Sequence, residues 1–366
     1  MKLFFVVCNN GLGHFKRCIE ILFKLTKKIK HYEANIACEK WQVNRFSDNY
    51  MIKELISKNN IRWHFDIISP GIKIEKDPLL YHDGRLINWI ERLDGIRSFE
   101  KSDIVLSDNL VQVLSLRKDA ILQGSFFWSD VFEYLYPKDN YVKDFINSER
   151  LLLDSNKPNM ICNKFLAMDS IFKKTKPVLT EWSGHDPKKR KNNNLNKRKK
   201  IAILIGATTL AESIARKLIM ILSETSYDIA VPKNINSKIQ NNNNISSFNF
   251  GSEDFLSCDL AICRPGLGTI QDCIYYSLPM IMFYENDNIE LKNNALKISE
   301  LGMGIILNDM LDIGKDNPNK LLNIIRNFIE SDQFTLIKEI MIDANFNGSD
   351  QTINWIINHQ STKVLN

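Results

Sequence analysis

The stretch LFFVVCNNGLGHFKRCIEILFKLTKKIK, residues 3–30, contains the pattern from which the fold can be predicted. Its first six residues are a continuous apolar run, which is typical of a strand buried on both faces of a sheet. From residue 15 onward, apolar side chains recur every three or four positions, as on one face of an amphipathic helix. Two asparagines and two glycines separate these patterns. A strand, a glycine-rich turn and a helix are the beginning of a β/α unit.

Short apolar runs and longer helical patterns alternate along the rest of the chain. Helical periodicity is clear over 49–58 and 210–223. Near-continuous apolar strands between helices indicate parallel sheets covered by helices on both faces, so we predict an α/β protein. The further strands are expected at 34–39, 61–68, 104–109, 120–125, 200–209, 227–231, 259–263, 279–284 and 303–307.

The basic run GHDPKKRKNNNLNKRKK, residues 184–200, interrupts this alternation, which begins again directly after it. A chain of 366 residues also exceeds one ordinary domain. We therefore predict an N-terminal domain over 1–183, a basic linker, a C-terminal domain over 201–348, and a final helix over 349–366 that packs back on the first domain. The basic run is either a solvated linker or a patch for an anionic lipid or acceptor.

Composition excludes several classes of protein. The net charge of +5 is small, and no recognition motif accompanies the basic run, so nucleic-acid binding is disfavoured. The seven cysteines show neither a Cys-x-x-Cys pair nor the spacing of a zinc site. No apolar stretch reaches the roughly 18 residues that span a bilayer. We expect a cytoplasmic protein, and peripheral contact with the inner face of the cell membrane stays open.

Glycine-rich turns follow three of the expected strands, at 8–17, 206–209 and 263–272. Ligands of open parallel sheets bind beyond the carboxyl ends of the strands. The first turn of a helix there offers N–H groups and a positive dipole end to a phosphate. The glycine-rich turn at 8–17 lacks the third glycine of a dinucleotide fingerprint. Glu39 is the only acid at the end of the second expected strand that could bind the hydroxyls of a ribose. A dehydrogenase is therefore disfavoured.

Residues 259–304 resemble the donor-binding half of a GT-B glycosyltransferase, and most of all the family of the lipid II N-acetylglucosaminyltransferase (MurG-like). The segment GLGHFKR, residues 11–17, resembles the Gly-x-Gly-His-x-x-Arg loop of a nucleotide-sugar hydrolase of pseudaminic acid synthesis. The resemblance implies two Rossmann-like domains that face each other across a cleft. The family features in the C-terminal segment are Asp272, Ser277-Leu278-Pro279, Asn294-Ala295 and Leu301-Gly302.

The resemblance assigns the nucleotide sugar, expected to be UDP-linked, to the second domain. In that family, the acid at the position of Asp272 binds the ribose hydroxyls; without the resemblance it could be an exposed helix residue. Glu290 stands where many GT-B enzymes begin an Asp-Gln pair that reads the sugar, and Leu291 replaces the amide. The other donor-binding residues that the resemblance implies are Gly206, Thr208, Thr209, Phe250, Gly251, Arg264, Gly266, Leu267, Gly268 and Thr269.

The resemblance assigns the acceptor to the first domain, with His14 as the catalytic base. A neutral imidazole can accept the proton of a hydroxyl as it attacks the anomeric carbon. From the residues alone, His14 could instead cap the helix or bond a backbone carbonyl, and Arg17 could bind a phosphate or an acidic neighbour. The aromatic run 126–136 is predicted to be core rather than an acceptor wall. The acceptor-side residues are expected to be Asn10, Gly11, Gly13, Arg17, Asp108, Asn109 and Ser125.

These observations predict an inverting, metal-independent glycosyltransferase of the hexosyltransferase type, active in cell-surface glycan synthesis. Its acceptor would be a glycan, a lipid-linked compound or a small hydroxyl compound. The sequence contains no Asp-x-Asp, so we expect no metal and no cofactor, with backbone amides and helix dipoles stabilising the leaving group. Two alternatives stay open. One is a nucleotide-sugar hydrolase, and the other is a non-catalytic nucleotide-sugar-binding subunit of a glycan-assembly complex.

Overall fold

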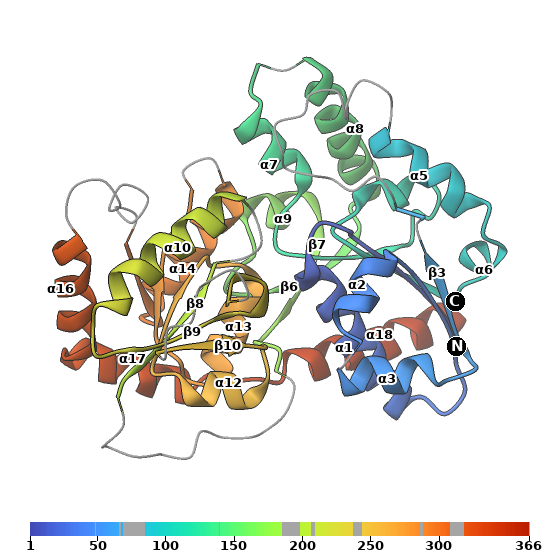
Figure 1. Cartoon of the computed structure of the whole chain (residues 1–366). Coiled ribbons are helices and arrows are strands. Elements are labelled where there is room, and N and C mark those ends of the chain that lie inside the picture. Colours follow the sequence, from blue (N-terminus) through green and yellow to red (C-terminus); the bar gives the residue numbers. More distant parts are fainter. Residues whose placement is uncertain are drawn as a thin grey trace. The chain divides into compact units, whose positions relative to one another are not determined.

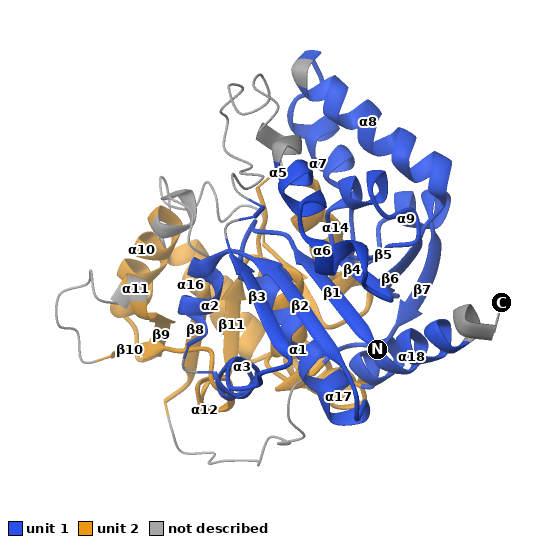
Figure 2. Ribbon diagram, turned by 90° about the vertical axis from the view of Figure 1, so that its right-hand side faces the viewer, with its two compact units in different colours: residues 1–183, 347–366 blue, residues 184–346 orange. Residues whose placement is uncertain are grey.

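The computed structural model of the protein, drawn in Figure 1, describes residues 1–47, 49–65, 67–68, 85–138, 140–184, 198–205, 209–236, 244–285, 288–307 and 318–365. The chain divides into two compact units, coloured separately in Figure 2. Unit 1 comprises residues 1–183 and 347–366, and unit 2 comprises residues 184–346. Each unit is built around a parallel sheet with helices beside it, which confirms the predicted α/β class.

The sheet of unit 1 has seven strands in the order β3-β2-β1-β4-β5-β6-β7, and every neighbouring pair is parallel. The chain winds outward in both directions from β1, so the strand order reverses between β1 and β4. This arrangement is the doubly wound α/β topology. The strands are β1 (Lys2–Val7), β2 (Glu33–Cys38), β3 (Ile61–Phe65), β4 (Ile104–Asp108), β5 (Ile121–Gln123), β6 (Asn159–Asn163) and β7 (Lys176–Thr180).

Helices of unit 1 follow most of its strands and cover the sheet. The inner strands, such as β1 and β2, are almost entirely buried because helices pack on them, whereas the edge strands β3 and β7 are partly exposed. The helices are α1 (Leu12–Lys28), α2 (Lys40–Arg45), α3 (Tyr50–Ile56), α5 (Arg85–Asp94), α6 (Arg97–Glu100), α7 (Trp128–Leu135), α8 (Asn140–Asn156), α9 (Asp169–Lys174) and α18 (Gly348–Leu365), with a 3₁₀ turn η1 at Val111–Ser115.

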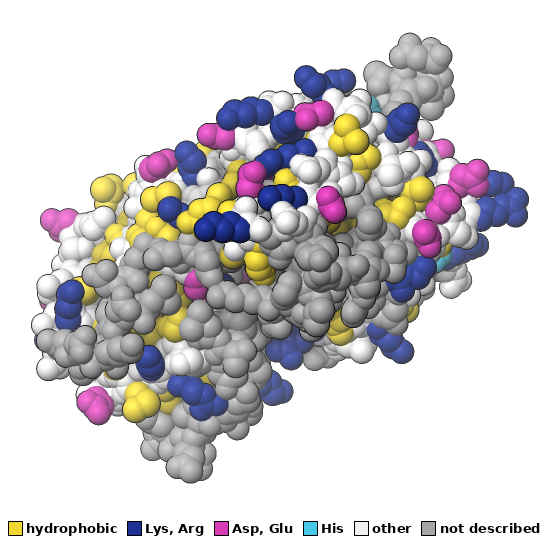
Figure 3. All heavy atoms as spheres, turned by 90° about the horizontal axis from the view of Figure 1, so that it is seen from above, with side chains coloured by type: hydrophobic (Ala, Val, Ile, Leu, Met, Phe, Trp, Pro, Cys, Tyr) yellow, Lys and Arg dark blue, Asp and Glu magenta, His cyan; other side chains and the backbone are white. Residues whose placement is uncertain are grey.

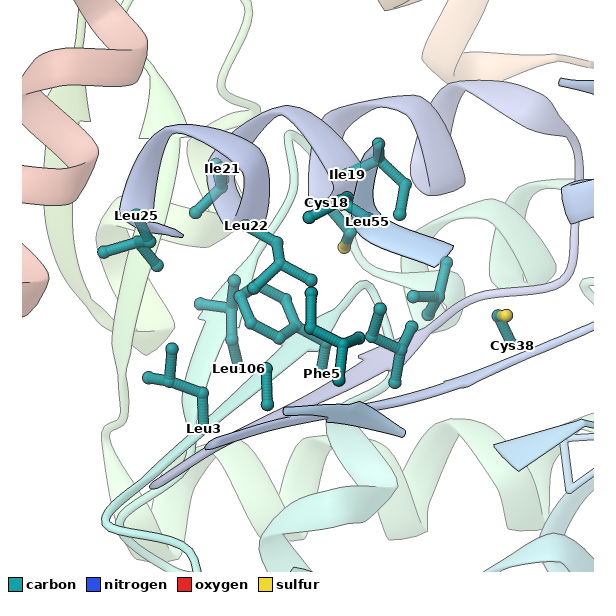
Figure 4. Close-up of a cluster of buried hydrophobic side chains, with 14 of the residues drawn as sticks. Leu3, Phe5, Cys18, Ile19, Ile21, Leu22, Leu25, Cys38, Leu55 and Leu106 are labelled. Carbon is teal, nitrogen blue, oxygen red and sulfur yellow. The ribbon is translucent and has the colours of Figure 1, made fainter. Parts of the chain in front are cut away.

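Helix α1 fixes the position of the turn that precedes it, because its apolar face is buried on the sheet. Figure 4 shows Cys18 and Leu22 of α1 above Phe5 and Leu106 of the central strands. A fully buried leucine such as Leu22 contributes about 1.5–3 kcal/mol relative to an exposed one. The first turn of α1 is therefore held rigidly over the carboxyl end of the sheet.

The C-terminal helix α18 belongs to unit 1 and packs against α1 and β7. Its entry is fixed by the backbone N–H of Gly348, which donates to the carbonyl of Trp182 (2.9 Å). The side chain of Gln351 accepts a hydrogen bond from the N–H of Glu181 (2.8 Å). The two segments cross so closely that a Cβ at position 348 would lie 2.2 Å from the carbonyl oxygen of Glu181. Only glycine fits at this crossing.

The sheet of unit 2 has six parallel strands in the order β10-β9-β8-β11-β12-β13, so its strand order reverses between β8 and β11. Its strands are β8 (Lys200–Leu204), β9 (Asp228–Pro232), β10 (Ile245–Phe248), β11 (Leu260–Cys263), β12 (Met280–Met282) and β13 (Gly304–Ile306). Its helices are α10 (Thr209–Ser223), α11 (Lys233–Asn236), α12 (Ser252–Ser257), α13 (Leu267–Tyr275), α14 (Ile289–Glu300), α16 (Pro318–Ile329) and α17 (Asp332–Ile342).

The basic run ends inside unit 2, because Lys200 is the first residue of β8. Residues 185–197 of the run lie outside the described residues. On the face of the molecule in Figure 3, Lys and Arg side chains lie beside Asp and Glu side chains rather than forming one continuous basic area. All seven cysteines are buried and free. Within the described ranges, no helix is long and apolar enough to cross a bilayer.

Candidate functional site

The first candidate site lies where the strand order of unit 1 reverses. Strands β1 and β4 are neighbours, and Val7 at the end of β1 pairs with Asp108 at the end of β4. In doubly wound proteins, the carboxyl ends of the strands at such a reversal point are where ligands bind. The glycine-rich turn and the start of α1 follow β1 at this point.

The turn after β1 is anchored by a side chain that the sequence analysis did not identify. Gln42 is fully buried in the short helix α2, and its Nε2 donates to the carbonyls of Cys8 (3.0 Å) and Gly11 (2.9 Å). Gly11 has a φ of +93°, a backbone conformation that residues other than glycine rarely adopt. A Cβ at Gly11 or Gly13 would meet no atom within 4 Å. These two glycines therefore leave open space beside the start of α1.

His14 and Asp108 form a close polar contact in this site. The Nδ1 atom of His14 lies 2.7 Å from Oδ1 of Asp108, whose side chain is completely buried. A carboxylate can only accept, so Nδ1 carries a hydrogen and donates it. In the neutral ring, Nε2 then has the free lone pair. The imidazole is 14% exposed, so the structure provides a partly accessible base with a defined tautomer.

Arg17 holds the same carboxylate from the next turn of α1. Its Nε donates to Oδ2 of Asp108 (2.8 Å) and its Nη2 to Oδ1 (2.7 Å), which is a bidentate pair. The Cys18 thiol approaches Oδ2 at 3.5 Å. Burial raises the pKa of Asp108, but the opposite charges of Arg17 and His14 outweigh burial and hold the pKa below its usual value. Asp108 is therefore an ionised carboxylate at neutral pH.

The aromatic run 126–136 contributes to the core and also reaches the site. Phe127, Trp128 and Phe132 are buried, as predicted for core residues. Phe126 is buried too, and its ring centroid lies 6.5 Å from that of His14 in an edge-to-face arrangement. Phe126 also packs edge-to-face on Trp128 at 5.1 Å. One side of the imidazole is thus fixed by the segment that leads into α7.

The other acceptor-side residues differ in their access to this space. Asn10 is partly exposed beside Gly11. Asn109 and Ser125 are each 4% exposed and point into the interior. Asn109 has a φ of +59°, and its amide occupies the space that a side chain at Gly124 would need. Neither amide atom of Asn109 has a hydrogen-bond partner within the described part of the chain.

The second candidate site lies at the corresponding reversal point of unit 2, between β8 and β11. The N–H of Arg264 donates to the carbonyl of Leu204 (3.2 Å) and ties the two strand ends together. Gly266 is the N-cap of α13, and Leu267 begins the helix. A Cβ at Gly266 or Gly268 would meet no atom within 4 Å. The N–H groups of this first turn, including that of Thr269, have no acceptor within the helix and carry its positive dipole end.

Two side chains that were not predicted to act on the donor hold this loop in place. Asn294 in α14 is 1% exposed, and its Nδ2 donates to the carbonyl of Pro265 (3.0 Å). Glu285 is 8% exposed, and its Oε2 accepts from Nε (3.1 Å) and Nη2 (2.8 Å) of Arg264. Asn294 was noted in the sequence as part of the Asn294-Ala295 pair that resembles the family. Glu285 carried no signal, because it lies 21 residues from its partner.

The remaining donor-side predictions fall on separate elements of unit 2. Phe250 is 52% exposed, and Gly251 is the N-cap of α12. Asp272 in α13 and Glu290 in the first turn of α14 are both partly exposed. Thr209 begins α10, whereas Gly206 and Thr208 lie outside the described residues. The described residues contain no group of three or more His, Cys, Asp and Glu side chains that could hold a metal ion.

The fold is that of the GT-B glycosyltransferases. The chain is similar over 98% of its length to the structure described as the glycotransferase of kitacinnamycin (TM-score 0.66, 12% identity, 98% of that chain). It is similar to Medicago truncatula UGT71G1 complexed with UDP-glucose (TM-score 0.65, 16% identity, 98% of each chain). It is also similar to Acinetobacter baumannii MurG (TM-score 0.58, 12% identity, 98% of this chain and 100% of that one).

Part of unit 2 also matches a known domain family. Residues 230–339 match the model of the glycosyltransferase family 28 C-terminal domain. This range contains the loop at 264–269, Asp272, Glu285, Glu290 and Asn294. No curated protein matches the chain. The domain match and the fold together support glycosyltransferase activity.

Proposed function

We propose that this protein is a cytoplasmic, inverting, metal-independent glycosyltransferase. It moves a sugar from a nucleotide donor, UDP-linked, to a hydroxyl group of an acceptor in cell-surface glycan synthesis. The observation that carries the proposal is the 2.7 Å contact between His14 Nδ1 and the buried Asp108, at the reversal point of a doubly wound sheet. It supplies an oriented base where such folds bind ligands.

In the proposed reaction, Nε2 of His14 takes the proton of the acceptor hydroxyl. The acceptor oxygen forms a bond to the anomeric carbon while the bond from that carbon to the diphosphate oxygen breaks. The diphosphate leaves with the electron pair, and because the acceptor oxygen attacks from the opposite face of the sugar, the configuration at the anomeric carbon inverts. Asp108 accepts the hydrogen bond from Nδ1 throughout and stabilises the imidazolium that forms.

The donor diphosphate is proposed to bind at the start of α13. The helix N-terminus has a positive dipole end, and the space beside Gly266 and Gly268 lets the backbone approach a phosphate. These groups would stabilise the leaving diphosphate without a metal ion. The MurG-like pattern of 259–304 supports ribose binding by Asp272 and sugar contact by Glu290. Structural neighbours in complex with UDP-glucose and with thymidine diphosphate support a pyrimidine nucleotide donor, and the MurG-like pattern of 259–304 favours uridine.

The donor half of the proposal is tested by thermal stabilisation. A ligand that binds only the folded state raises the melting temperature. We expect UDP or a UDP-linked sugar to stabilise the protein equally with and without EDTA. Stabilisation by another nucleotide alone would overturn the uridine assignment, and loss of the effect with EDTA would overturn metal independence.

The catalytic half is tested with His14→Ala and the control His31→Ala, whose histidine is exposed on the loop before β2. Loss of a general base should lower turnover roughly 10²-fold or more, whereas the control should keep it. Nucleotide release and sugar release are measured separately. Free sugar formed at full rate without an acceptor would replace the transferase with the hydrolase that GLGHFKR resembles. Binding of UDP without turnover on any acceptor would indicate a non-catalytic subunit.

A further inference from the structure

We propose that Glu285 is a specificity-determining residue for the donor: its Oε1 atom accepts a hydrogen bond from a hydroxyl group of the sugar that the nucleotide carries. The proposal rests on the proposed function for the place of the diphosphate at the start of α13. The ligand is a nucleotide-linked sugar with a free ring hydroxyl. The role of Glu285 follows from its contacts in unit 2, which the sequence did not indicate.

Glu285 lies just beyond the carboxyl end of β12, beside the loop that leads into α13. The N–H of Phe283 donates to the carbonyl of Cys263 (3.2 Å), so the chain that leaves β12 still runs beside the end of β11. The carbonyl of Glu285 accepts from the N–H of Asn288 (3.0 Å), which is the N-cap of α14. Glu285 is therefore tied to both β11 and the start of α14, at the edge of the sheet where ligands bind.

Arg264 engages only one oxygen of the Glu285 carboxylate. Its Nε and Nη2 atoms both donate to Oε2, at 3.1 and 2.8 Å, and among the described residues no donor reaches Oε1. Each carboxylate oxygen can accept about two hydrogen bonds. The Glu285 side chain is 10% exposed, so it is nearly buried but still reaches the surface. An acceptor in this position suits a ligand that brings its own O–H or N–H group.

The ion pair determines which part of a nucleotide sugar contacts Glu285. Arg264 balances the charge of the carboxylate, so Glu285 does not repel a diphosphate that is bound by the neighbouring N–H groups of α13. The diphosphate of a nucleotide sugar carries no hydrogen at neutral pH, so it has nothing to donate to Oε1. A hydroxyl group does, and its hydrogen bond to a charged acceptor is stronger than one to a neutral acceptor. The partner of Oε1 is therefore a hydroxyl group.

Strand order favours the sugar over the ribose as the source of this hydroxyl. A nucleotide sugar has its nucleoside on one side of the diphosphate and its sugar on the other. In the order β10-β9-β8-β11-β12-β13, the turn at Gly266 follows β11, Glu285 follows β12, and Phe250 follows β10 on the opposite side. The ring of Phe250 is 52% exposed and offers a face on which a base can stack. With the base on the β10 side, the sugar lies on the β12 side with Glu285.

The neighbouring sequence leaves a polar role for Glu285 to fill. Leu291, which replaces the amide of the Asp-Gln pair, is 6% exposed in α14 and has no polar group to offer a sugar. Glu290, one position earlier, is partly exposed in the first turn of the same helix. Glu285 therefore adds a second carboxylate, besides Glu290, near the start of α14.

The test compares UDP with UDP-sugars, because both contain ribose and diphosphate and only the UDP-sugars contain the sugar. Binding to the purified full chain is measured by titration calorimetry with UDP, UDP-glucose, UDP-galactose and UDP-N-acetylglucosamine. Glu285→Ala removes both carboxylate oxygens, whereas Glu285→Gln keeps one oxygen that can accept a hydrogen bond. Glu300→Ala is the matched control, because it removes a carboxylate that pairs with Lys297 at the far end of α14.

For the UDP-sugar that the wild type binds most tightly, we expect Glu285→Ala to raise Kd by about tenfold or more relative to the Kd of UDP, because a hydrogen bond to a charged group is lost. Glu285→Gln should raise this ratio less, because its amide oxygen still accepts. Glu300→Ala should leave the ratio unchanged. A role confined to holding the loop would weaken UDP and UDP-sugars equally, since both need the first turn of α13.

Glu285→Ala leaves Arg264 without its partner, so the Arg264→Met, Glu285→Ala double variant is made as well, and we expect the same rise in the Kd ratio. An unchanged ratio in Glu285→Ala, or an equal loss for UDP and the UDP-sugar, overturns this proposal and leaves the uridine donor in place. A wild type that binds none of the four probes overturns the uridine donor of the proposed function and this proposal together.

Discussion

Glu149 provides a test of buried electrostatics in unit 1. Its side chain is completely buried in α8, where Oε1 accepts from the N–H of Ser129 (2.7 Å) and Oε2 from Nε2 of Gln112 (3.0 Å). Burial raises the pKa of Glu149 from 4.5 to about 7, because these hydrogen bonds offset only part of the desolvation cost. Ser129 lies in the first turn of α7, directly after the aromatic segment beside His14.

The sign of the effect follows from the two protonation states. Between pH 4.5 and about 7, folded Glu149 holds a proton that the unfolded chain has released. The free energy of unfolding therefore falls as pH rises through this window and is level above it. A gap of roughly 2.5 units, at about 1.4 kcal/mol per unit, gives a loss of roughly 3 kcal/mol.

The variant Glu149→Gln should remove this dependence. Its amide oxygen can still accept from the N–H of Ser129, and its NH₂ can donate to Oε1 of Gln112, which has no partner within the described residues, once the Gln112 amide rotates. Because the introduced amide is neutral at every pH, we expect unit 1 to gain roughly 1–3 kcal/mol above pH 7. At pH 4, where the native carboxyl is protonated, the gain should vanish.

The assay is urea unfolding followed by tryptophan fluorescence at a series of pH values. All six tryptophans lie in unit 1, so their emission reports the unfolding of that unit alone. Glu100→Gln, an exposed glutamate on α6, is the control and should keep the wild-type pH dependence. A slope between pH 4.5 and 7 that persists unchanged in Glu149→Gln would refute the reasoning. The six tryptophans are Trp41, Trp63, Trp89, Trp128, Trp182 and Trp355.

Two further predictions concern residues at close backbone contacts. Gly348→Ala should destabilise unit 1 by about 3 kcal/mol or more in the same urea assay, because the new Cβ would lie 2.2 Å from the carbonyl oxygen of Glu181; wild-type stability would contradict the crossing described above. Asn294→Ala should speed amide hydrogen exchange over residues 264–270 and weaken stabilisation by UDP, because the carbonyl of Pro265 loses its buried donor. Unchanged exchange there would show that the loop is held by other contacts.

The α/β class could be predicted from the sequence, and the turns proposed as ligand sites could be located in it, because both kinds of signal are local. Apolar runs and helical periodicity reflect the burial of neighbouring residues, so they can be read over 3–30 without knowing the rest of the fold. In a parallel sheet, the carboxyl ends of the strands share one edge, so glycine-rich turns after strands indicate ligand sites there. The short helix α2 has no such periodicity over its six residues, and Gln42 was therefore missed.

The sequence by itself therefore indicated the residues that we propose to carry the chemistry: a histidine in a glycine-rich turn, an arginine three positions later, and an acid at the end of a strand. Only the tertiary structure decided how they are paired. His14 and Asp108 are 94 residues apart, and the sheet order that places β4 beside β1 brings them to 2.7 Å. From the sequence alone, Arg17 could bind either a phosphate or an acidic neighbour. In the structure it pairs with Asp108. The physical reason is that a hydrogen bond requires two groups within about 3 Å, a distance that strand order and helix packing set and that separation along the chain does not.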